Sequence, residues 1–234
     1  MTLTLTRTHW VSIAAVALAL LFAGAATVAS AGGDDGHPGG HGGGAAAAPA
    51  ADSADAGFAR DMAVHHQQAV EMSFVVRDRT QDEEVRRLAY DIANTQANQR
   101  GMLLGWLDLW GLPKVDSGAE PMAWMEQAQG KGGHGDGAHG DDGGQPDSGA
   151  VMPGMATRAE LDRLAKASGK QAEVLYLQLM TDHHQGGVAM AEGCASLCTV
   201  PQEKALAQGM VDAQQSEMDL MADLLKKRGA APRP

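Results

Sequence analysis

Apolar residues recur every three or four positions along two long stretches of the chain, residues 55–110 and 169–228. This spacing places them on one face of a helix, and β-branched runs are few, so both stretches predict helices. The polar segment DRTQDEE divides the first stretch into helices over residues 55–79 and 82–110. Gly111 stands where a helix-ending glycine is expected, and Pro113 lies just beyond it.

The second stretch divides in the same way. A helix over residues 169–197 precedes Pro201, which suits the first turn of the next helix. That last helix runs through the basic residues 226–228 and ends at Gly229. Ahead of this pair, the sequence TRAE from Thr157 onward is a capping box, and it predicts a short additional helix.

The two stretches are copies of one unit. A single offset of 118 residues aligns them without a gap and gives 11 identities over 54 positions, where about three or four would arise by chance. Phe58 falls on Tyr176, and Gly111 falls on Gly229. Each unit therefore predicts the same pair of antiparallel helices.

Two such hairpins make an all-α four-helix bundle. One domain over residues 55–229 is expected, because a lone helical hairpin buries too little apolar surface. Its parts are repeat 1 (55–111), a Gly-, Asp- and His-rich crossover (114–151) and repeat 2 (152–229), with a tail over 230–234.

The N-terminal region lies outside this domain. Residues 1–31 contain a long apolar run that ends in the small-residue sequence ASA, which predicts either a cleaved signal peptide or an uncleaved membrane anchor. Either one places the rest of the chain outside the cytoplasm: secreted, periplasmic or tethered to the membrane surface. Residues 32–54 are a Gly-, His- and Ala-rich segment that cannot form a core, so we expect a disordered linker.

The charge balance limits the classes of partner that the chain is expected to bind. The chain carries 18 basic and 29 acidic residues, a formal net charge of −11. No basic stripe is present for a phosphate backbone, so nucleic-acid binding is not expected. An acidic surface attracts cations instead.

Each repeat carries two adjacent histidines framed by methionines at the same spacing, Met-x-x-His-His-x5-Met. At about 100° per residue, the two histidines and both methionines share one helical face about 120° wide. A packing role would tolerate Leu or Ile in place of Met, so the repetition favours a ligand role over core packing. The candidate metal ligands are Met62, His65, His66, Met72, Met180, His183, His184 and Met190.

Thioether and imidazole donors together suit Cu(I), and Ag(I) by the same chemistry. Zinc rarely takes thioether ligands, a di-iron bundle would need Glu-x-x-His motifs, and no haem attachment motif is present. Because a ligating histidine must be neutral, we expect part of the copper affinity to fall toward pH 5. The segment MPGM at residues 152–155 is interpreted either as a further thioether arm or as an apolar cover on the bundle.

Other candidate donors are less definite. Cys194 and Cys198 predict a disulfide outside the cytoplasm, although their spacing fits poorly unless the last helical turn unwinds. A disulfide or two free thiols are favoured over a thiolate metal site. Four more histidines lie in Gly- and Asp-rich tracts that are interpreted as linkers, with loose metal gathering as the alternative: His37, His41, His134 and His139.

Several of these segments resemble a bacterial family known as domain of unknown function 305. The resemblance rests on MAVHHQQAVEM, MTDHHQGGVAM, WLDLWG, the element from Gln214 to Glu217 and the segment MPGMATRAELDRLAKASG. It implies a ferritin-like bundle, export from the cytoplasm, and Cu(I) or Ag(I) binding by the same eight Met and His residues. The first repeat departs from the pattern, with Gln99 in the place of Glu217 and Arg100 in the place of Met218.

The sequence thus predicts an exported copper-binding protein that sequesters Cu(I) or hands it over, in support of copper homeostasis or tolerance. The alternative is a non-catalytic structural or interaction bundle whose histidines bind no metal. A metal-dependent enzyme ranks last, because no nucleophile with a base and no acid–base pair stands in a motif.

Overall fold

Four long helices carry the fold, and the ends of the first two are set by local caps. The computed structural model describes residues 47–128 and 151–234. Helix α2 (Ala54–Arg79) begins where the Ser53 hydroxyl accepts a hydrogen bond from the Ala56 amide. Helix α3 (Glu83–Trp110) begins at the Asp82 cap and ends at Gly111, whose φ of 68° lies in the left-handed region that favours glycine.

The second hairpin consists of α6 (Gly169–Leu197) and α7 (Pro201–Lys227), with Pro201 in the first turn of α7. The short helix α5 (Arg158–Lys166) starts at the expected capping box, in which Thr157 and Glu160 bond each other's backbone amides. These bounds agree with the sequence prediction to within one or two residues, because local signals such as the Thr157 cap, Pro201 and Gly111 mark several of the ends.

Helix α4 (Ala123–Ala128) was not predicted, since its segment belongs to the expected crossover. Tertiary contacts hold it in place. The Met122 amide and the Trp124 indole N–H both donate to the Asp61 carboxylate, at 2.8 and 3.0 Å. The Trp124 ring packs edge-on against Phe58 on α2.

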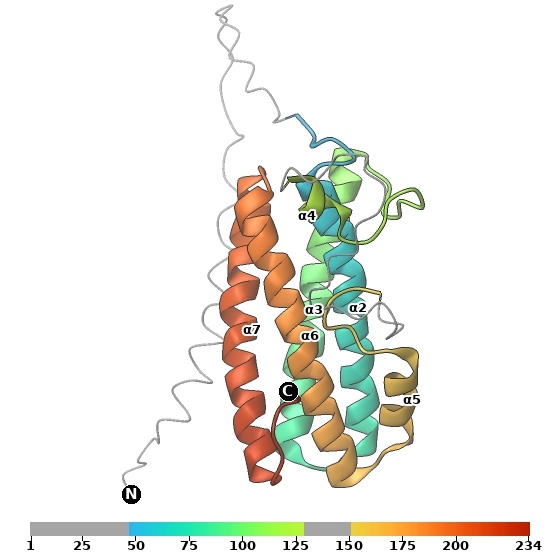
Figure 1. Cartoon of the computed structure of the whole chain (residues 1–234), viewed down its shortest axis with the longest axis vertical. Coiled ribbons are helices and arrows are strands. Elements are labelled where there is room, and N and C mark those ends of the chain that lie inside the picture. The colour runs from blue at the N-terminus through green and yellow to red at the C-terminus, as the bar shows by residue number, and fades with distance from the viewer. Residues whose placement is uncertain (1–46, 129–150) are drawn as a thin grey trace, which may run out of the picture. The chain divides into compact units, whose positions relative to one another are not determined.

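The hairpins α2–α3 and α6–α7 meet along α2 and α6, which run antiparallel, while α5 packs beside α2 (Figure 1). The predicted all-α bundle of two helical hairpins is confirmed, and the described residues contain no strand. None of the helices in residues 47–128 and 151–234 is long and apolar enough to cross a membrane. The expected signal or anchor over residues 1–31 and the histidine-bearing tracts lie outside the described residues.

The core consists of two apolar clusters. The Phe58 cluster includes Met62, Leu103 and Met190, and the Tyr176 cluster includes Met72 and Met180 among its members. Phe58 and Tyr176 are equivalent in the repeat, so each hairpin contributes the same position to a different cluster. The duplication is therefore visible in the packing: equivalent residues of the two repeats lie in different apolar clusters.

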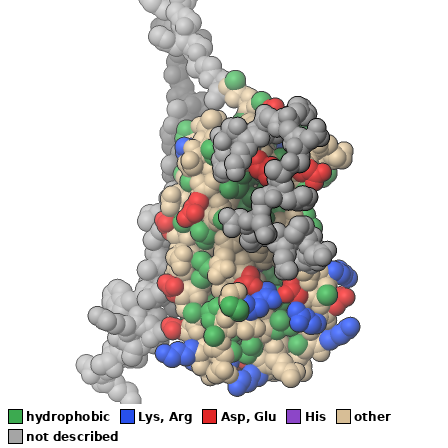
Figure 2. Space-filling view, viewed as in Figure 1, with side chains coloured by type: hydrophobic (Ala, Val, Ile, Leu, Met, Phe, Trp, Pro, Cys, Tyr) green, Lys and Arg blue, Asp and Glu red, His purple; other side chains and the backbone are tan. Residues whose placement is uncertain are grey.

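Basic side chains collect around α5 and the adjacent end of the bundle (Figure 2). Helices α2 and α7 both end there, with Arg77, Arg79, Lys226 and Lys227 in their last turns. Positive charge at these termini offsets the partial negative charge of the unpaired carbonyl groups. No histidine side chain shows on the uncovered part of the face in Figure 2.

The segment before α5 is clamped onto both inner helices. The Gln68 side chain on α2 exchanges two hydrogen bonds with the Ala156 backbone, at 2.6 and 2.9 Å. A Cβ atom at Gly186 on α6 would overlap the Pro153 carbonyl oxygen, so the contact requires glycine. Met152 is buried in the Phe58 cluster. Residues 152–155 therefore lie over the bundle as an apolar cover, which is one of the two interpretations given to this segment.

Replacing Gly186 with alanine should force residues 153–154 away from α6 and destabilise the protein by about 1–3 kcal/mol, the usual cost of overpacking. Urea unfolding followed by circular dichroism measures the change. Gly209→Ala is the matched control, because a Cβ atom there meets nothing within 4 Å. That variant should be as stable as the wild type or up to about 1 kcal/mol more stable. Equal stability of the two alanine variants would contradict the close contact.

Candidate metal centre

The interface between α2 and α6 brings all four framed histidines together. His65 and His66 lie on α2, His183 and His184 lie on α6, and each side chain is 0% exposed. The rings of His65 and His183 stack with their centroids 3.8 Å apart and their planes tilted by 36°. Because α2 and α6 are antiparallel, equivalent histidines of the two repeats face each other across the interface.

Two of the imidazoles are held by backbone carbonyl groups. His183 donates from Nε2 to the carbonyl oxygen of His65 at 3.0 Å, and His65 donates from Nε2 to the carbonyl oxygen of Pro153 at 3.2 Å. A carbonyl oxygen can only accept, so Nε2 carries the proton in both rings. Nδ1 of each neutral ring then holds a free lone pair.

The other two imidazoles are held by side chains of the outer helices. His184 Nε2 lies 2.6 Å from Glu217 Oε2 on α7, and His66 Nε2 lies 2.9 Å from Gln99 Oε1 on α3. Gln99 therefore occupies the same position in the first repeat as Glu217 does in the second. The two acceptors differ in charge, so the imidazole of His184 faces a carboxylate while that of His66 faces a neutral amide.

All four Nδ1 atoms are buried and have no hydrogen-bond partner in the structure. Leaving a buried acceptor unpaired costs about 1–3 kcal/mol. Ligation of a metal ion through Nδ1 would satisfy these atoms. Metal-binding histidines commonly donate their other ring N–H to a carbonyl or a carboxylate, and this is the arrangement found at each ring.

Burial keeps three of the four rings, His65, His66 and His183, neutral near neutral pH. Burial lowers the pKa of His65 to about 4 and, with the charge of His65 adding to the effect, lowers the pKa of His66 to about 3. Burial and the three neighbouring imidazoles hold the pKa of His183 well below its usual range. Protons therefore compete for these nitrogens only in strong acid. The loss of copper affinity expected near pH 5 assumed an ordinary imidazole pKa, whereas burial lowers the pKa values of His65, His66 and His183.

The framing methionines are all fully buried, and they pair across the repeats. Met62 of the first frame shares the Phe58 cluster with Met190 of the second, and Met72 shares the Tyr176 cluster with Met180. Antiparallel packing of α2 and α6 causes this exchange, because the start of one frame meets the end of the other. Thioether side chains thus belong to both apolar clusters, and every frame contributes one to each.

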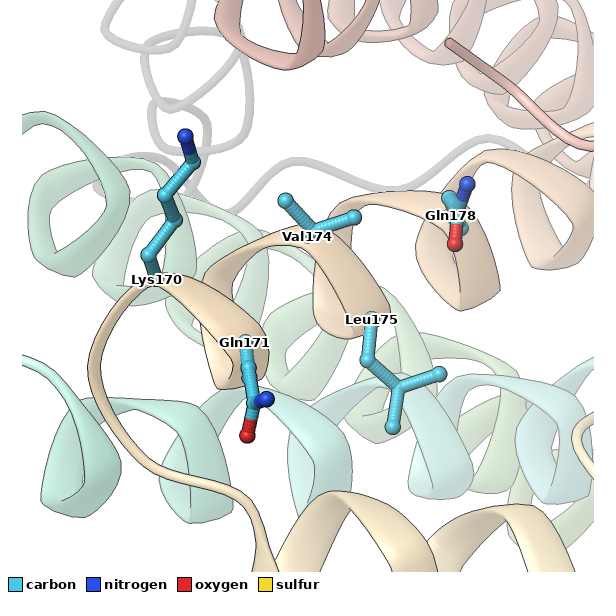
Figure 3. A pocket seen from close by; sticks show the side chains of 5 residues that line it. All are labelled: Lys170, Gln171, Val174, Leu175 and Gln178. Carbon is cyan, nitrogen blue, oxygen red and sulfur yellow. The ribbon is translucent and has the colours of Figure 1, made fainter. Parts of the chain in front are cut away.

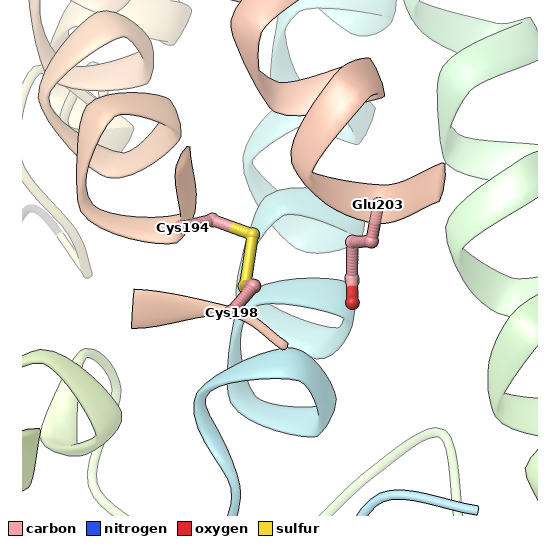
Figure 4. A group of neighbouring side chains, drawn as sticks. All are labelled: Cys194, Cys198 and Glu203. Carbon is pink, nitrogen blue, oxygen red and sulfur yellow. A yellow bond between two sulfur atoms is a disulfide. The ribbon is translucent and has the colours of Figure 1, made fainter. Parts of the chain in front are cut away.

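The histidines do not converge on a single point. Among the described residues, the one group of three His, Cys, Asp or Glu ligand atoms within 4.8 Å of one another consists of Cys194, Cys198 and Glu203 (Figure 4). The stacked rings of His65 and His183 present their faces to each other. A metal ion at this interface would therefore need thioether donors, or rotation of the rings, in addition to the Nδ1 atoms as they stand.

Cys194 and Cys198 form a disulfide, which is one of the two states that the sequence favoured. Their Cα atoms are 4.8 Å apart. Helix α6 ends at Leu197, and Cys198 takes an extended conformation while its amide still donates to the Cys194 carbonyl at 2.8 Å. The bond therefore forms at the helix end without the unwound last turn that the sequence suggested. In this state the two sulfur atoms are not thiolate ligands.

A shallow surface pocket lies elsewhere, on α6. Its lining comes from one helix alone: Lys170, Gln171, Val174, Leu175 and Gln178 (Figure 3). None of the eight candidate ligands borders it. Its lysine, amide and aliphatic side chains bring no soft metal donor together.

The metal-free protein should lose stability as the pH falls from about 6.5 to about 4. In that window the unfolded chain protonates its histidines, whereas the folded chain keeps His65, His66 and His183 neutral. Each such group removes about 1.4 kcal/mol per pH unit. Burial raises the pKa of Glu203 to about 9, so the folded chain keeps this carboxyl protonated at pH values where the unfolded chain loses the proton. Between pH 6.5 and 4.5 this effect offsets the loss of stability from about one of the three histidines.

Urea midpoints at several pH values measure this slope. The variant His66→Gln removes one titrating group and should flatten the slope by about 1.4 kcal/mol per pH unit. An unchanged slope in this variant would contradict the burial of a neutral imidazole at position 66.

Comparison with known proteins identifies the family to which the chain belongs. The family described as "Domain of unknown function (DUF305)" matches residues 55–225. A solved structure of a DUF305 protein from Streptomyces coelicolor, described as a secreted protein, is 63% identical to this chain. The match covers 79% of this chain and 99% of that one, with a TM-score of 0.67. A DUF305 fragment from Deinococcus radiodurans is 28% identical over 74% of this chain and 96% of that one, with a TM-score of 0.56.

A more distant likeness is to CopM in its Cu(I)-bound form, at 20% identity and a TM-score of 0.53, over 74% of this chain and 96% of that one. CopM is also known in Cu(II)-bound and Ag-bound forms. At this identity the likeness shows a shared helical-bundle fold. No protein with a curated description matches the chain. Because the family match spans most of its length, the chain belongs to the DUF305 family.

Proposed function

We propose that this protein binds Cu(I), and Ag(I) by the same chemistry, outside the cytoplasm and either sequesters the ion or hands it over. The proposed ligands are the two Met-x-x-His-His-x5-Met frames, Met62, His65, His66, Met72, Met180, His183, His184 and Met190. One observation carries the proposal. Each of the four imidazoles is held at Nε2 and keeps a buried, unpartnered Nδ1.

The donor set selects the metal. Neutral imidazole nitrogen and thioether sulfur are borderline and soft ligands, which suit monovalent copper and silver better than Mg²⁺, Ca²⁺ or Zn²⁺. With the pKa values of His65 and His66 at about 4 and 3, the ion displaces no proton from these rings near neutral pH. Binding through His65 and His66 should then depend little on pH between 7 and 5.

The comparisons add support at the level of the fold. CopM has the same fold, and its solved forms hold Cu(I), Cu(II) and Ag. The secreted character given to the Streptomyces relative accords with the signal or anchor expected over residues 1–31. If that apolar run stays uncleaved as an anchor, it would tether the bundle to the outer face of the membrane. The net charge of −11 favours the approach of cations.

We favour binding over catalysis. The framed histidines are fully buried, and no nucleophile is paired with a base among them. A Cu(I) carrier or store needs donor atoms and a shielded environment, both of which the α2–α6 interface supplies. The competing hypothesis, a structural or interaction bundle that binds no metal, is decided by the first experiment below.

Titration of Cu(I) against a competing chelator should show tight binding by the wild type and weaker binding by the double variants His65→Ala/His66→Ala and His183→Ala/His184→Ala. Each pair removes two imidazole ligands, and we expect a loss of at least about a hundredfold. Circular dichroism checks that the helices remain. If the folded variants compete as well as the wild type, the copper proposal is wrong and the interaction bundle is favoured.

Methionine variants separate ligation from packing. Met62→Leu conserves volume but removes a proposed donor, so the affinity for Cu(I) should fall by about tenfold while stability changes by less than about 1.5 kcal/mol. Met221→Leu is the matched control. Met221 is fully buried, its equivalent in the first repeat is Leu103, and it lies outside the frames.

The hydrogen-bond acceptors on α3 and α7, Gln99 and Glu217, should affect Cu(I) binding by the two repeats differently. Glu217→Gln keeps an acceptor for His184 but removes its charge, which lowers the basicity of the imidazole and should weaken Cu(I) binding by about tenfold. Gln99→Glu is the reverse change at the equivalent position and should strengthen binding through His66. Competition titrations of both variants test this, and equal shifts in the same direction would contradict it.

A further inference from the structure

The corner where α6 meets α7 buries an unusual set of side chains. Cys194, Cys198, Glu203 and Asp55 are 0%, 2%, 0% and 1% exposed. They come from the end of α6, the connection to α7, the first turn of α7 and the first turn of α2. Figure 4 shows the disulfide beside the Glu203 carboxyl. None of these residues belongs to the Met–His frames.

At the opposite end of the bundle, the equivalent buried carboxylate is paired with a positive charge. The repeat relates Asp55 to Glu173. Glu173 accepts a hydrogen bond from Thr80 at 2.6 Å and one from the Arg228 guanidinium at 2.7 Å. Its negative charge is therefore paired with a positive charge. The residue equivalent to Arg228 in the first repeat is Trp110, which brings no charge to Asp55.

Asp55 is satisfied in another way. Its carboxylate accepts hydrogen bonds from the Thr199 amide at 2.8 Å, the Thr199 hydroxyl at 3.1 Å and the Val200 amide at 2.7 Å. These bonds tie the start of α2 to the start of α7. They leave the negative charge of Asp55 without a cationic partner at this corner.

Glu203 adds a second carboxyl group beside it. The equivalent residue in the first repeat is the buried Val85, so an apolar side chain fills this position in the other copy. Neither oxygen of Glu203 has a hydrogen-bond partner. Burial, together with the charge of Asp55, raises the pKa of Glu203 to about 9. An interaction of the protonated Glu203 carboxyl with the Asp55 carboxylate adds to this shift. In the oxidised protein a buried, protonated carboxyl thus stands where the other repeat has valine.

An oxygen of Glu203 and the sulfur atoms of Cys194 and Cys198 all lie within 4.8 Å of one another. We propose that reduction of the disulfide converts this corner into a metal site, in which Cys194, Cys198 and Glu203 bind a divalent cation of the zinc type. The site uses none of the eight residues of the copper frames, and it exists only in the reduced protein.

The redox step needs a dithiol reductant. It supplies two electrons and two protons to the Cys194–Cys198 bond, which breaks to give two thiols, while the reductant closes to its own disulfide. Metal binding then releases the two thiol protons and the proton of Glu203. The two thiolates and the carboxylate carry three negative charges, of which the cation neutralises two.

The ligand types decide the class of metal. Two thiolates exclude Mg²⁺ and Ca²⁺, which take oxygen ligands, and a carboxylate is a poor partner for Cu(I). Zn²⁺ accepts sulfur and carboxylate oxygen together. Two cysteines four residues apart, with Cys198 at the extended C-cap of α6, provide adjacent ligands without rearrangement of the helix.

The test uses the full chain, reduced with a dithiol that is then removed under anaerobic conditions, and titrated with Co²⁺ as a spectroscopic substitute for Zn²⁺. The reduced wild type should bind one Co²⁺ with thiolate-to-metal charge-transfer absorption, and Zn²⁺ should displace it. The oxidised protein should show no such band. Histidine ligation gives no thiolate band, so His183→Ala/His184→Ala should leave the signal unchanged and a failed copper titration would not affect this result.

Two variants keep the proposal falsifiable. Glu203→Val restores the residue type of the other repeat, so it should fold in both redox states and weaken Co²⁺ binding by at least about tenfold. Cys194→Ser/Cys198→Ser should abolish the band. The proposal is overturned if the reduced wild type shows no charge-transfer band, or if Glu203→Val binds Co²⁺ as tightly as the wild type.

Discussion

The structure depends on the requirement that every buried imidazole N–H finds an acceptor. Four histidines meet at the α2–α6 interface, and their Nε2 atoms reach a backbone carbonyl, a second backbone carbonyl, an amide and a carboxylate. These four acceptors lie on α2, on the segment before α5, on α3 and on α7. The histidine layer therefore fixes the positions of all four long helices and of the cover formed by residues 152–156. What it leaves unsatisfied is Nδ1, the atom available to a metal.

Duplication explains both the regularity of the bundle and its differences. Antiparallel packing of the copies pairs Met62 with Met190 and Met72 with Met180 in the two apolar clusters, so each cluster receives one thioether from each repeat. The copies have diverged at their ends. One end neutralises a buried carboxylate with Arg228, and the other places Glu203 beside Asp55 and a disulfide. A symmetric ancestor would have had matching ends, so the charge pattern marks where the repeats took on separate chemistry.

Much of the fold could be predicted because its determinants are local. Asp82, Gly111, Thr157 and Pro201 each set a helix end through groups within a few residues. The placement of Met and His on one face followed from helical geometry. Helix α4 could not be predicted in this way, because Asp61, about sixty residues away in the chain, holds it in place. Gln99 was noted only as a departure from Glu217, and its bond to His66 became visible only in the structure.

By itself the sequence determined the helices, their duplication and the soft-donor face of each copy, because periodicity and capping act over a few residues. Only the tertiary structure decided which atoms are free to act. The carbonyl of Pro153 reaches His65 across 88 residues, and Asp55 meets the start of α7 across 144 residues. The acceptor at each ring, the pairing of methionines and the burial of the Glu203 carboxyl all depend on such distant contacts. Burial then changes the pKa values, since the energy of a charge depends on the groups that surround it.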